Sequence, residues 1–101
     1  MEEITSIEHF RDIVNNNAYV FMDVYAEWCG PCKKIAPKIE KLVDDYSNVK
    51  FIKLDMDKFP KFAKDLKVKY LPTFILFNEG RDIERVQKAD LEKVKDMLKD
   101  C

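Results

Sequence analysis

The stretch from Tyr19 to Tyr25 is apolar on both of its alternating faces, and Asp23 is its one charged residue. A strand with one solvated face alternates apolar and polar side chains, whereas a strand covered on both faces shows a continuous apolar run. We therefore predict a central strand here, with helices on each side of its sheet. An isolated carboxylate on such a strand is costly unless it is paired or protonated, so Asp23 needs compensation.

Helical patterns occupy much of the remaining sequence. Apolar residues at helical spacing predict helices over residues 5–14, 31–46, 60–66 and 91–98. Thr5 and Glu8 form a capping-box pattern for the first helix, which the triplet Asn15 to Asn17 is predicted to end, and Asp90 is placed to cap the last. Pro37 lies inside the longest helix and predicts a kink there.

Extended patterns over residues 49–56, 73–77 and 83–86 predict further strands. The last two flank Glu79-Gly80, a Gly-containing turn that favours an antiparallel hairpin. The order helix, strand, helix, strand, helix, hairpin, helix then predicts an α/β fold, a three-layer α/β/α sandwich around a central mixed sheet of four or five strands. At 101 residues the chain is expected to form a single domain over residues 1–101.

The charge balance and the apolar runs exclude some classes of partner. A formal net charge of -1 gives no bulk attraction to nucleic acid or anionic membranes, so neither is expected as a partner. The apolar runs are far shorter than the roughly 20 residues that cross a bilayer. The acidic segment from Met1 to Thr5 lacks the pattern of a secretory signal, so we expect a cytoplasmic protein.

Two of the three cysteines lie in Trp28-Cys29-Gly30-Pro31-Cys32, where the central strand meets the longest helix. With Cys29 at the N-cap, its sulfur can accept a hydrogen bond from the backbone N–H of Cys32, and the helix dipole favours thiolate over thiol. Cys29 is therefore predicted to be the nucleophile in thiol–disulfide exchange, because the thiolate is the attacking species. Cys32 is expected to be less exposed and to resolve the mixed disulfide formed on Cys29.

The residues around the cysteine pair favour a reductant over an oxidant, and the other possible ligands in the chain argue against a metal site. Gly30 and Pro31 suit a tight first helical turn, and a histidine in place of Pro31 would favour an oxidant, so its absence favours a reductant. The alternative of a metal half-site would need two more ligands, and only His9 and Cys101 remain, both near the termini. Cys101 is expected to be an exposed bystander that could form an intermolecular disulfide.

The segment from Trp28 to Cys32, with Asp23-Val24-Tyr25-Ala26-Glu27 before it and Lys33 after it, resembles the thioredoxin family, and the resemblance covers nearly the whole chain. It implies the thioredoxin-like form of the α/β/α sandwich. Tyr70-Leu71-Pro72-Thr73 resembles the cis-proline loop of that family, so Pro72 is expected to be cis and Leu71 to contact substrate. Trp28 would shield the cysteine pair, and Gly30 and Pro31 would lie at the substrate surface.

The resemblance also implies roles for Asp23 and Lys53. They match the buried aspartate and the lysine partner of the family, in which the carboxylate assists proton removal from the second cysteine, here Cys32. Lys53 lies on the neighbouring predicted strand, from which it could supply the charge that Asp23 needs. From the residues alone, a solvated edge position for Asp23, a solvent-facing Lys53 and a trans Pro72 remain alternatives.

Two positions depart from the family pattern. Tyr25 stands where a tryptophan is common, and Gln87 stands where a glycine usually helps to shape the substrate groove. The redox chemistry is expected to survive these changes. They are expected to affect partner recognition instead.

By this resemblance the chain is expected to be an enzyme that reduces protein disulfides. It would be regenerated by an NADPH-dependent thioredoxin reductase, with clients such as ribonucleotide reductase, peroxiredoxins and methionine sulfoxide reductases. A monomer with no bound cofactor and no metal is expected. The alternatives are a disulfide isomerase or oxidase, against which the missing signal argues, and a binding or co-chaperone module that uses the fold as a scaffold.

Overall fold

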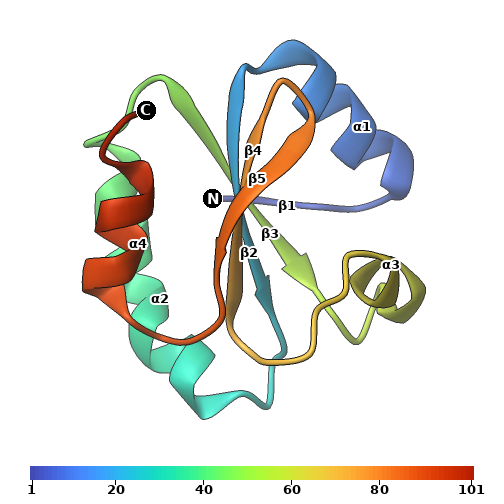
Figure 1. The fold of residues 1–101 in the computed structure, drawn as a ribbon. Coiled ribbons are helices and arrows are strands. Elements are labelled where there is room, and N and C mark those ends of the chain that lie inside the picture. The colour runs from blue at the N-terminus through green and yellow to red at the C-terminus, as the bar shows by residue number, and fades with distance from the viewer.

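The computed structural model describes residues 1–101, which form a sheet between two layers of helices (Figure 1). The sheet has five strands in the order β1-β3-β2-β4-β5, so β2 is its centre. β1, β3 and β2 run parallel, whereas β4 is antiparallel to β2 and β5 to β4. The strands are β1 (Glu2–Glu3), β2 (Tyr19–Tyr25), β3 (Val49–Asp55), β4 (Thr73–Asn78) and β5 (Arg81–Val86).

Two helices cover each face of this sheet. α2 and α4 lie together on one face, and α1 and α3 lie on the other (Figure 1). The helices are α1 (Ile7–Asn16), α2 (Gly30–Val43), α3 (Pro60–Asp65) and α4 (Leu91–Leu98). The predicted three-layer sandwich with a mixed sheet is therefore confirmed. None of the helices has the length and apolar character needed to cross a membrane.

The helix ends show where the sequence patterns were and were not sufficient. α1 is capped by Ser6, whose Oγ accepts from the backbone N–H of His9 at 3.0 Å, so the predicted cap at Thr5 is wrong by one residue. α1 also continues through Asn16, which was predicted to break it. The side-chain amide of Asn16 donates to the carbonyl of Asp12 at 2.7 Å, one turn back in the same helix, so this side chain adds to the helical hydrogen bonding instead of ending it. α2 ends at Val43 instead of Tyr46 and contains Pro37.

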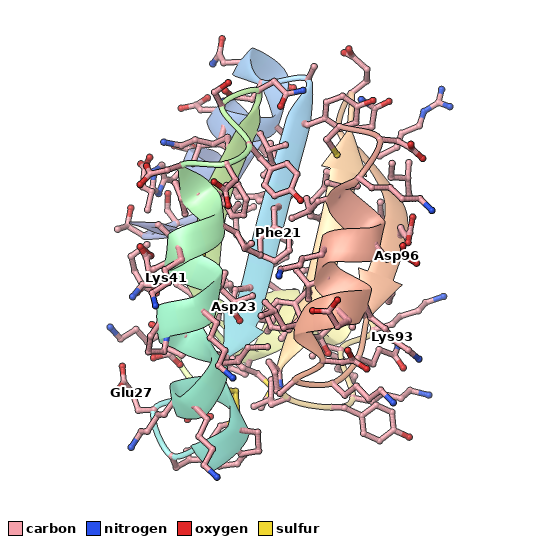
Figure 2. All side chains as sticks on the ribbon, turned by 90° about the vertical axis from the view of Figure 1, so that its left-hand side faces the viewer. Phe21, Asp23, Glu27, Lys41, Lys93 and Asp96 are labelled. Carbon is pink, nitrogen blue, oxygen red and sulfur yellow. A yellow bond between two sulfur atoms is a disulfide. The ribbon has the colours of Figure 1, made fainter.

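Both faces of β2 are buried, as its continuous apolar run predicted. Phe21 lies on the side of α2 and α4 (Figure 2), where it packs against Phe51 and Phe74 with ring centroids 4.9 and 5.5 Å apart. On the side of α1 and α3, aliphatic residues such as Val20 and Ile52 form a second cluster. Burial of these side chains on both faces is the main stabilising contribution to the fold, because it removes apolar surface from water.

The hairpin and the last helix follow the predicted local chemistry. Glu79 and Gly80 have φ of 51° and 78°, which matches the positive φ that two-residue hairpin turns require. The Asp90 side chain accepts from the backbone N–H of Lys93 at 3.1 Å, so the predicted cap of α4 is confirmed. Both features depend on neighbouring residues only.

Asp90→Ala is expected to lower the free energy of unfolding by about 1 kcal/mol, because one backbone N–H at the start of α4 loses its acceptor. Urea denaturation of the oxidised protein measures this difference. Asp90→Asn is the matched control, since its carbonyl oxygen can keep the cap while the charge is removed. An equal loss in both variants would show that the charge, and not the cap, stabilises α4.

Candidate active site

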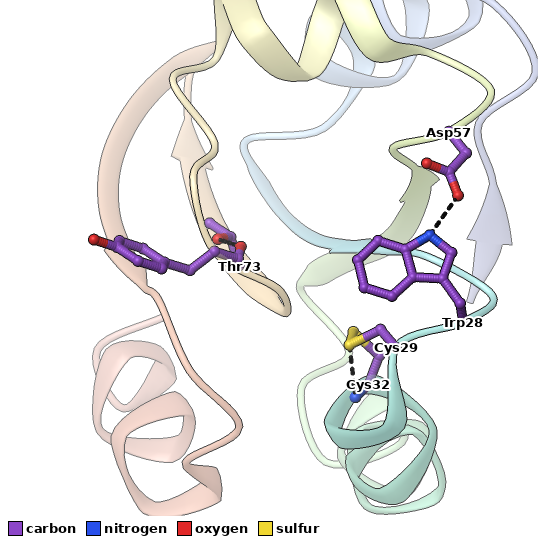
Figure 3. The surroundings of a disulfide bond; sticks show 6 residues. Trp28, Cys29, Cys32, Asp57 and Thr73 are labelled. Carbon is purple, nitrogen blue, oxygen red and sulfur yellow. Dashed lines mark hydrogen bonds between the residues drawn. A yellow bond between two sulfur atoms is a disulfide. The ribbon is translucent and has the colours of Figure 1, made fainter.

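The two cysteines lie at the start of α2, directly after the turn that leaves β2 (Figure 3). Cys29 is the N-cap residue, and its Sγ accepts from the backbone N–H of Cys32 at 3.2 Å. The predicted cap is therefore confirmed. The two Sγ atoms are joined as a disulfide, with the Cα atoms 5.3 Å apart. Pro31 stands in the first turn, where its missing N–H removes no hydrogen bond.

The disulfide is buried. Cys29 is 4% exposed and Cys32 is 5% exposed, so the two are equally inaccessible in this oxidised form, and the predicted lower exposure of Cys32 is not seen in it. Both pack with Ala26 in a small apolar cluster, against which Tyr25 and Leu71 also pack. The two sulfurs are joined to each other, so they share one environment. Exposure therefore does not distinguish the nucleophile here, and the N-cap position of Cys29 is the feature that does.

The loop before β4 lies against this cluster. The peptide bond between Leu71 and Pro72 is cis, as the resemblance implied, so the trans alternative is wrong. The Thr73 hydroxyl donates to the backbone carbonyl of Tyr70 within the loop. Leu71 packs against the cysteine cluster, which brings the two predicted halves of the site together. Gly30, between the two cysteines, is exposed, and the space that a Cβ would occupy there is open.

Trp28 stands beside the disulfide and is held by a residue that the sequence analysis missed. Its indole N–H donates to Oδ2 of Asp57 at 2.8 Å (Figure 3), while the backbone N–H of Asp57 donates to Asp55. Trp28 is 67% exposed, and Tyr70 is 61% exposed. Trp28 thus presents a large apolar surface to solvent beside the disulfide (Figure 3), and Tyr70 presents another on the loop before β4. An exposed aromatic surface of this kind is typical of protein-binding sites.

Asp23 is buried at the centre of the sheet, 4% exposed, so the alternative of a solvated edge residue is wrong. Its Oδ1 has no hydrogen-bond partner. Burial raises the pKa of Asp23 from 3.8 to about 7, while the positive charge of Lys53 opposes the increase and the negative charge of Glu3 adds to it. A carboxyl with such a pKa can hold or release a proton near neutral pH.

Lys53 lies next to Asp23 in the sheet but does not form an ion pair with it. Its Nζ lies 3.7 Å from Oε1 of Glu3 and 5.6 Å from the centroid of the Tyr25 ring. The predicted pairing of Lys53 with Asp23 is therefore not a direct contact. Lys53 acts on Asp23 only through space, by the electrostatic effect of its charge. Glu3 was not predicted, because it belongs to the two-residue strand β1, which has no detectable pattern in the sequence.

A cavity of about 250 Å³ connects these groups. It is lined by eleven residues, among which are Asp23, Cys32 and Lys53. A larger cavity of about 520 Å³ lies between α1 and α3 and contains none of the predicted site residues. The smaller cavity gives Asp23 and Cys32 a shared space, through which a proton could pass between them.

The third cysteine, Cys101, is free. Cys101 is half-buried and packs against the core cluster under α4, so the prediction of an exposed position is wrong. Burial, and then the charges of Asp100 and Glu84, raise the pKa of the Cys101 thiol.

No group of three or more His, Cys, Asp or Glu side chains could hold a metal ion. The metal half-site interpretation of Cys29 and Cys32 therefore has no support.

Comparison with known proteins agrees with this geometry. The family model described as Thioredoxin matches residues 2–100. The chain is 34% identical to thioredoxin-2 of Pyricularia oryzae over 97% of its own length and 57% of that protein. It is 35% identical to thioredoxin-1 of Schizosaccharomyces pombe over 98% of its length and 96% of that protein. The crystal structure of oxidised mitochondrial thioredoxin 3 from Saccharomyces cerevisiae matches with a TM-score of 0.95 and 35% identity, covering 100% of this chain and 95% of that one.

Proposed function

The chain belongs to the thioredoxin family, and we propose that it is a thiol–disulfide oxidoreductase that reduces disulfides in other proteins through Cys29 and Cys32. The observation that supports this most directly is the Cys29–Cys32 disulfide at the N-terminus of α2, beside the cis-Pro72 loop. A disulfide between residues three positions apart closes too small a loop to be mainly structural. Its position at a helix N-terminus favours reactivity.

The reaction consists of two exchanges. The thiolate of Cys29 attacks one sulfur of the client disulfide, so that a mixed disulfide forms and the other client sulfur leaves as a thiolate that takes up a proton. Cys32 then loses its proton and attacks Sγ of Cys29, which releases the second client thiolate and leaves the Cys29–Cys32 disulfide. The client gains two electrons and two protons in total. The helix N-terminus favours the anionic form of Cys29 in the reduced protein.

We assign Asp23 as the group that accepts the proton of Cys32. It lines the same cavity as Cys32, and its pKa of about 7 lets it accept a proton at the pH at which exchange takes place. The client chain docks on a surface formed by Trp28, Gly30, Pro31 and Leu71. Pro72 follows Leu71 in the same loop and is itself buried, so it supports this surface from within. The exposure of Trp28 and the open space at Gly30 support this assignment.

The oxidised pair is returned to the dithiol by electrons from NADPH through a separate thioredoxin reductase, and this chain binds no cofactor itself. A relative from Mycobacterium leprae, 38% identical over 86% of this chain, is named a bifunctional thioredoxin reductase/thioredoxin. A structure with a TM-score of 0.94 and 34% identity is described in connection with thiol resolution in a yeast mitochondrial 1-Cys peroxiredoxin. Both names support a reductase and peroxiredoxin-type clients as partners. We further propose a monomer in the cytoplasm.

Insulin reduction with dithiothreitol as the electron source tests the proposal. The protein should accelerate precipitation of the insulin B chain well above the rate with dithiothreitol alone, and it should consume NADPH when a thioredoxin reductase replaces dithiothreitol. Cys101→Ser is the matched control, because it removes a cysteine outside the site and should retain the rate. A rate no higher than background would refute the reductase and favour a binding or co-chaperone module.

A further inference from the structure

Three charged residues form one row across adjacent parallel strands. Glu3 of β1 is paired in register with Lys53 of β3, and Lys53 is paired with Asp23 of β2. Residues paired across neighbouring strands present their side chains on the same face of the sheet. This face is the one covered by α2 and α4, on which Figure 2 shows Asp23. Lys53 therefore stands between two carboxylates and can approach either one.

The lysine is held on the side of Glu3. Its Nζ lies 3.7 Å from Oε1 of Glu3 and over the ring of Tyr25, whereas Oδ1 of Asp23 has no hydrogen-bond partner. The Tyr25 hydroxyl donates to both carboxylate oxygens of Glu3, at 2.7 and 2.9 Å. Burial, and then the hydrogen bond to Glu3, raise the pKa of Tyr25, so this hydroxyl remains a donor throughout the neutral range.

Solvation explains why this arrangement is stable. The side chains of Glu3 and Lys53 are 33% and 39% exposed, so their ion pair stays partly hydrated. A move of the ammonium towards Asp23, which is 4% exposed, would take it out of water, and burying an ammonium is costly unless a paired carboxylate fully compensates it. Tyr25 fixes the carboxylate that competes with Asp23.

We propose that Glu3 is a positioning residue that, held by Tyr25, draws Lys53 away from Asp23 and so keeps Asp23 able to carry a proton beside Cys32. The relevance of this arrangement to catalysis rests on the proposed disulfide reduction. The other titratable groups around the cavity are Glu27 before α2, Cys32, Lys33 and Glu40 of α2, and the amino group of Met1, which pairs with Glu40 at 2.6 Å. On the other side of Asp23, the residue of β4 paired with it is Phe74, which carries no charge.

Titration of the Asp23 side-chain carboxyl by NMR in the oxidised protein tests this coupling. Glu3→Gln should lower the pKa of Asp23 by about 1, since it removes a repulsive charge and also frees Lys53. In a Lys53→Met background the same substitution should lower the pKa of Asp23 by clearly less, because only the direct repulsion is lost. The two backgrounds thus separate an effect through Lys53 from an effect through space.

Tyr25→Phe is the matched control, because it removes only the hydroxyl and leaves every charge in the row. It should lower the pKa of Asp23 in the same direction as Glu3→Gln, and it should do so only when Lys53 is present. Equal shifts from Glu3→Gln in the two backgrounds, or no shift in Tyr25→Phe, would overturn the proposal. The titration needs no turnover, so its failure is distinguishable from failure of the reductase assay.

Discussion

Cys32→Ser is expected to convert the protein from a catalyst into a covalent trap, in which the client stays joined to Cys29 as a mixed disulfide. The first exchange needs only Cys29, whose Sγ lies at the N-cap of α2 and accepts the backbone N–H of residue 32, which serine retains. The second exchange needs a thiol at position 32, and a hydroxyl cannot replace it. Turnover should fall to the uncatalysed background while the adduct accumulates.

Cys29→Ser should differ in kind, because it removes the nucleophile and leaves a cysteine one helical turn further on. That variant should show neither turnover nor a trapped client. Non-reducing electrophoresis and mass spectrometry after incubation of each reduced variant with a disulfide substrate measure the adduct. The experiment is best made in a Cys101→Ser background, so that no third thiol reacts. A stable adduct on Cys32 in Cys29→Ser would reverse the assignment of nucleophile and resolving cysteine.

The features predicted correctly are those that depend on neighbouring residues. The apolar run from Tyr19 to Tyr25 marked the central strand because burial on both faces leaves a local signature. The cap at Cys29 and the cap at Asp90 each involve residues three positions apart. The cap of α1 was misplaced by one residue, since Thr5 and Ser6 offer the same hydroxyl and only the backbone conformation selects between them.

The features that were missed depend on contacts between distant segments. Trp28 and Asp57 are 29 residues apart, and Tyr25 and Glu3 are 22 apart. Glu3 reaches Lys53 only because β1 pairs with β3 in one register, and a strand of two residues carries no periodicity that could reveal it. The sequence therefore indicated that Asp23 needs a compensating charge, but it could not reveal that a second carboxylate competes for Lys53.

Asp23→Asn is expected to change the free energy of unfolding in a pH-dependent way. The difference between variant and wild type should be about 4 kcal/mol more favourable to the variant at pH 8 than in acid. Burial raises the pKa of Asp23 from 3.8 to about 7 in the folded state, and a difference of about 3 in pKa corresponds to about 4 kcal/mol. Below pH 3.8 the carboxyl is protonated in both states and the cost is absent. As the pH rises towards 7, the unfolded chain loses this proton first, so the folded wild type loses stability.

The difference in unfolding free energy between Asp23→Asn and the oxidised wild type, measured in urea from about pH 4 to about pH 8, isolates this one group. The difference should increase through the interval and level off above pH 7, whatever constant offset the buried amide adds. Asp45→Asn, at an exposed position, controls for the loss of one negative charge and should show no comparable increase. A flat difference would mean that Asp23 is ionised and fully compensated in the folded protein, which would require Lys53 to leave Glu3 for Asp23.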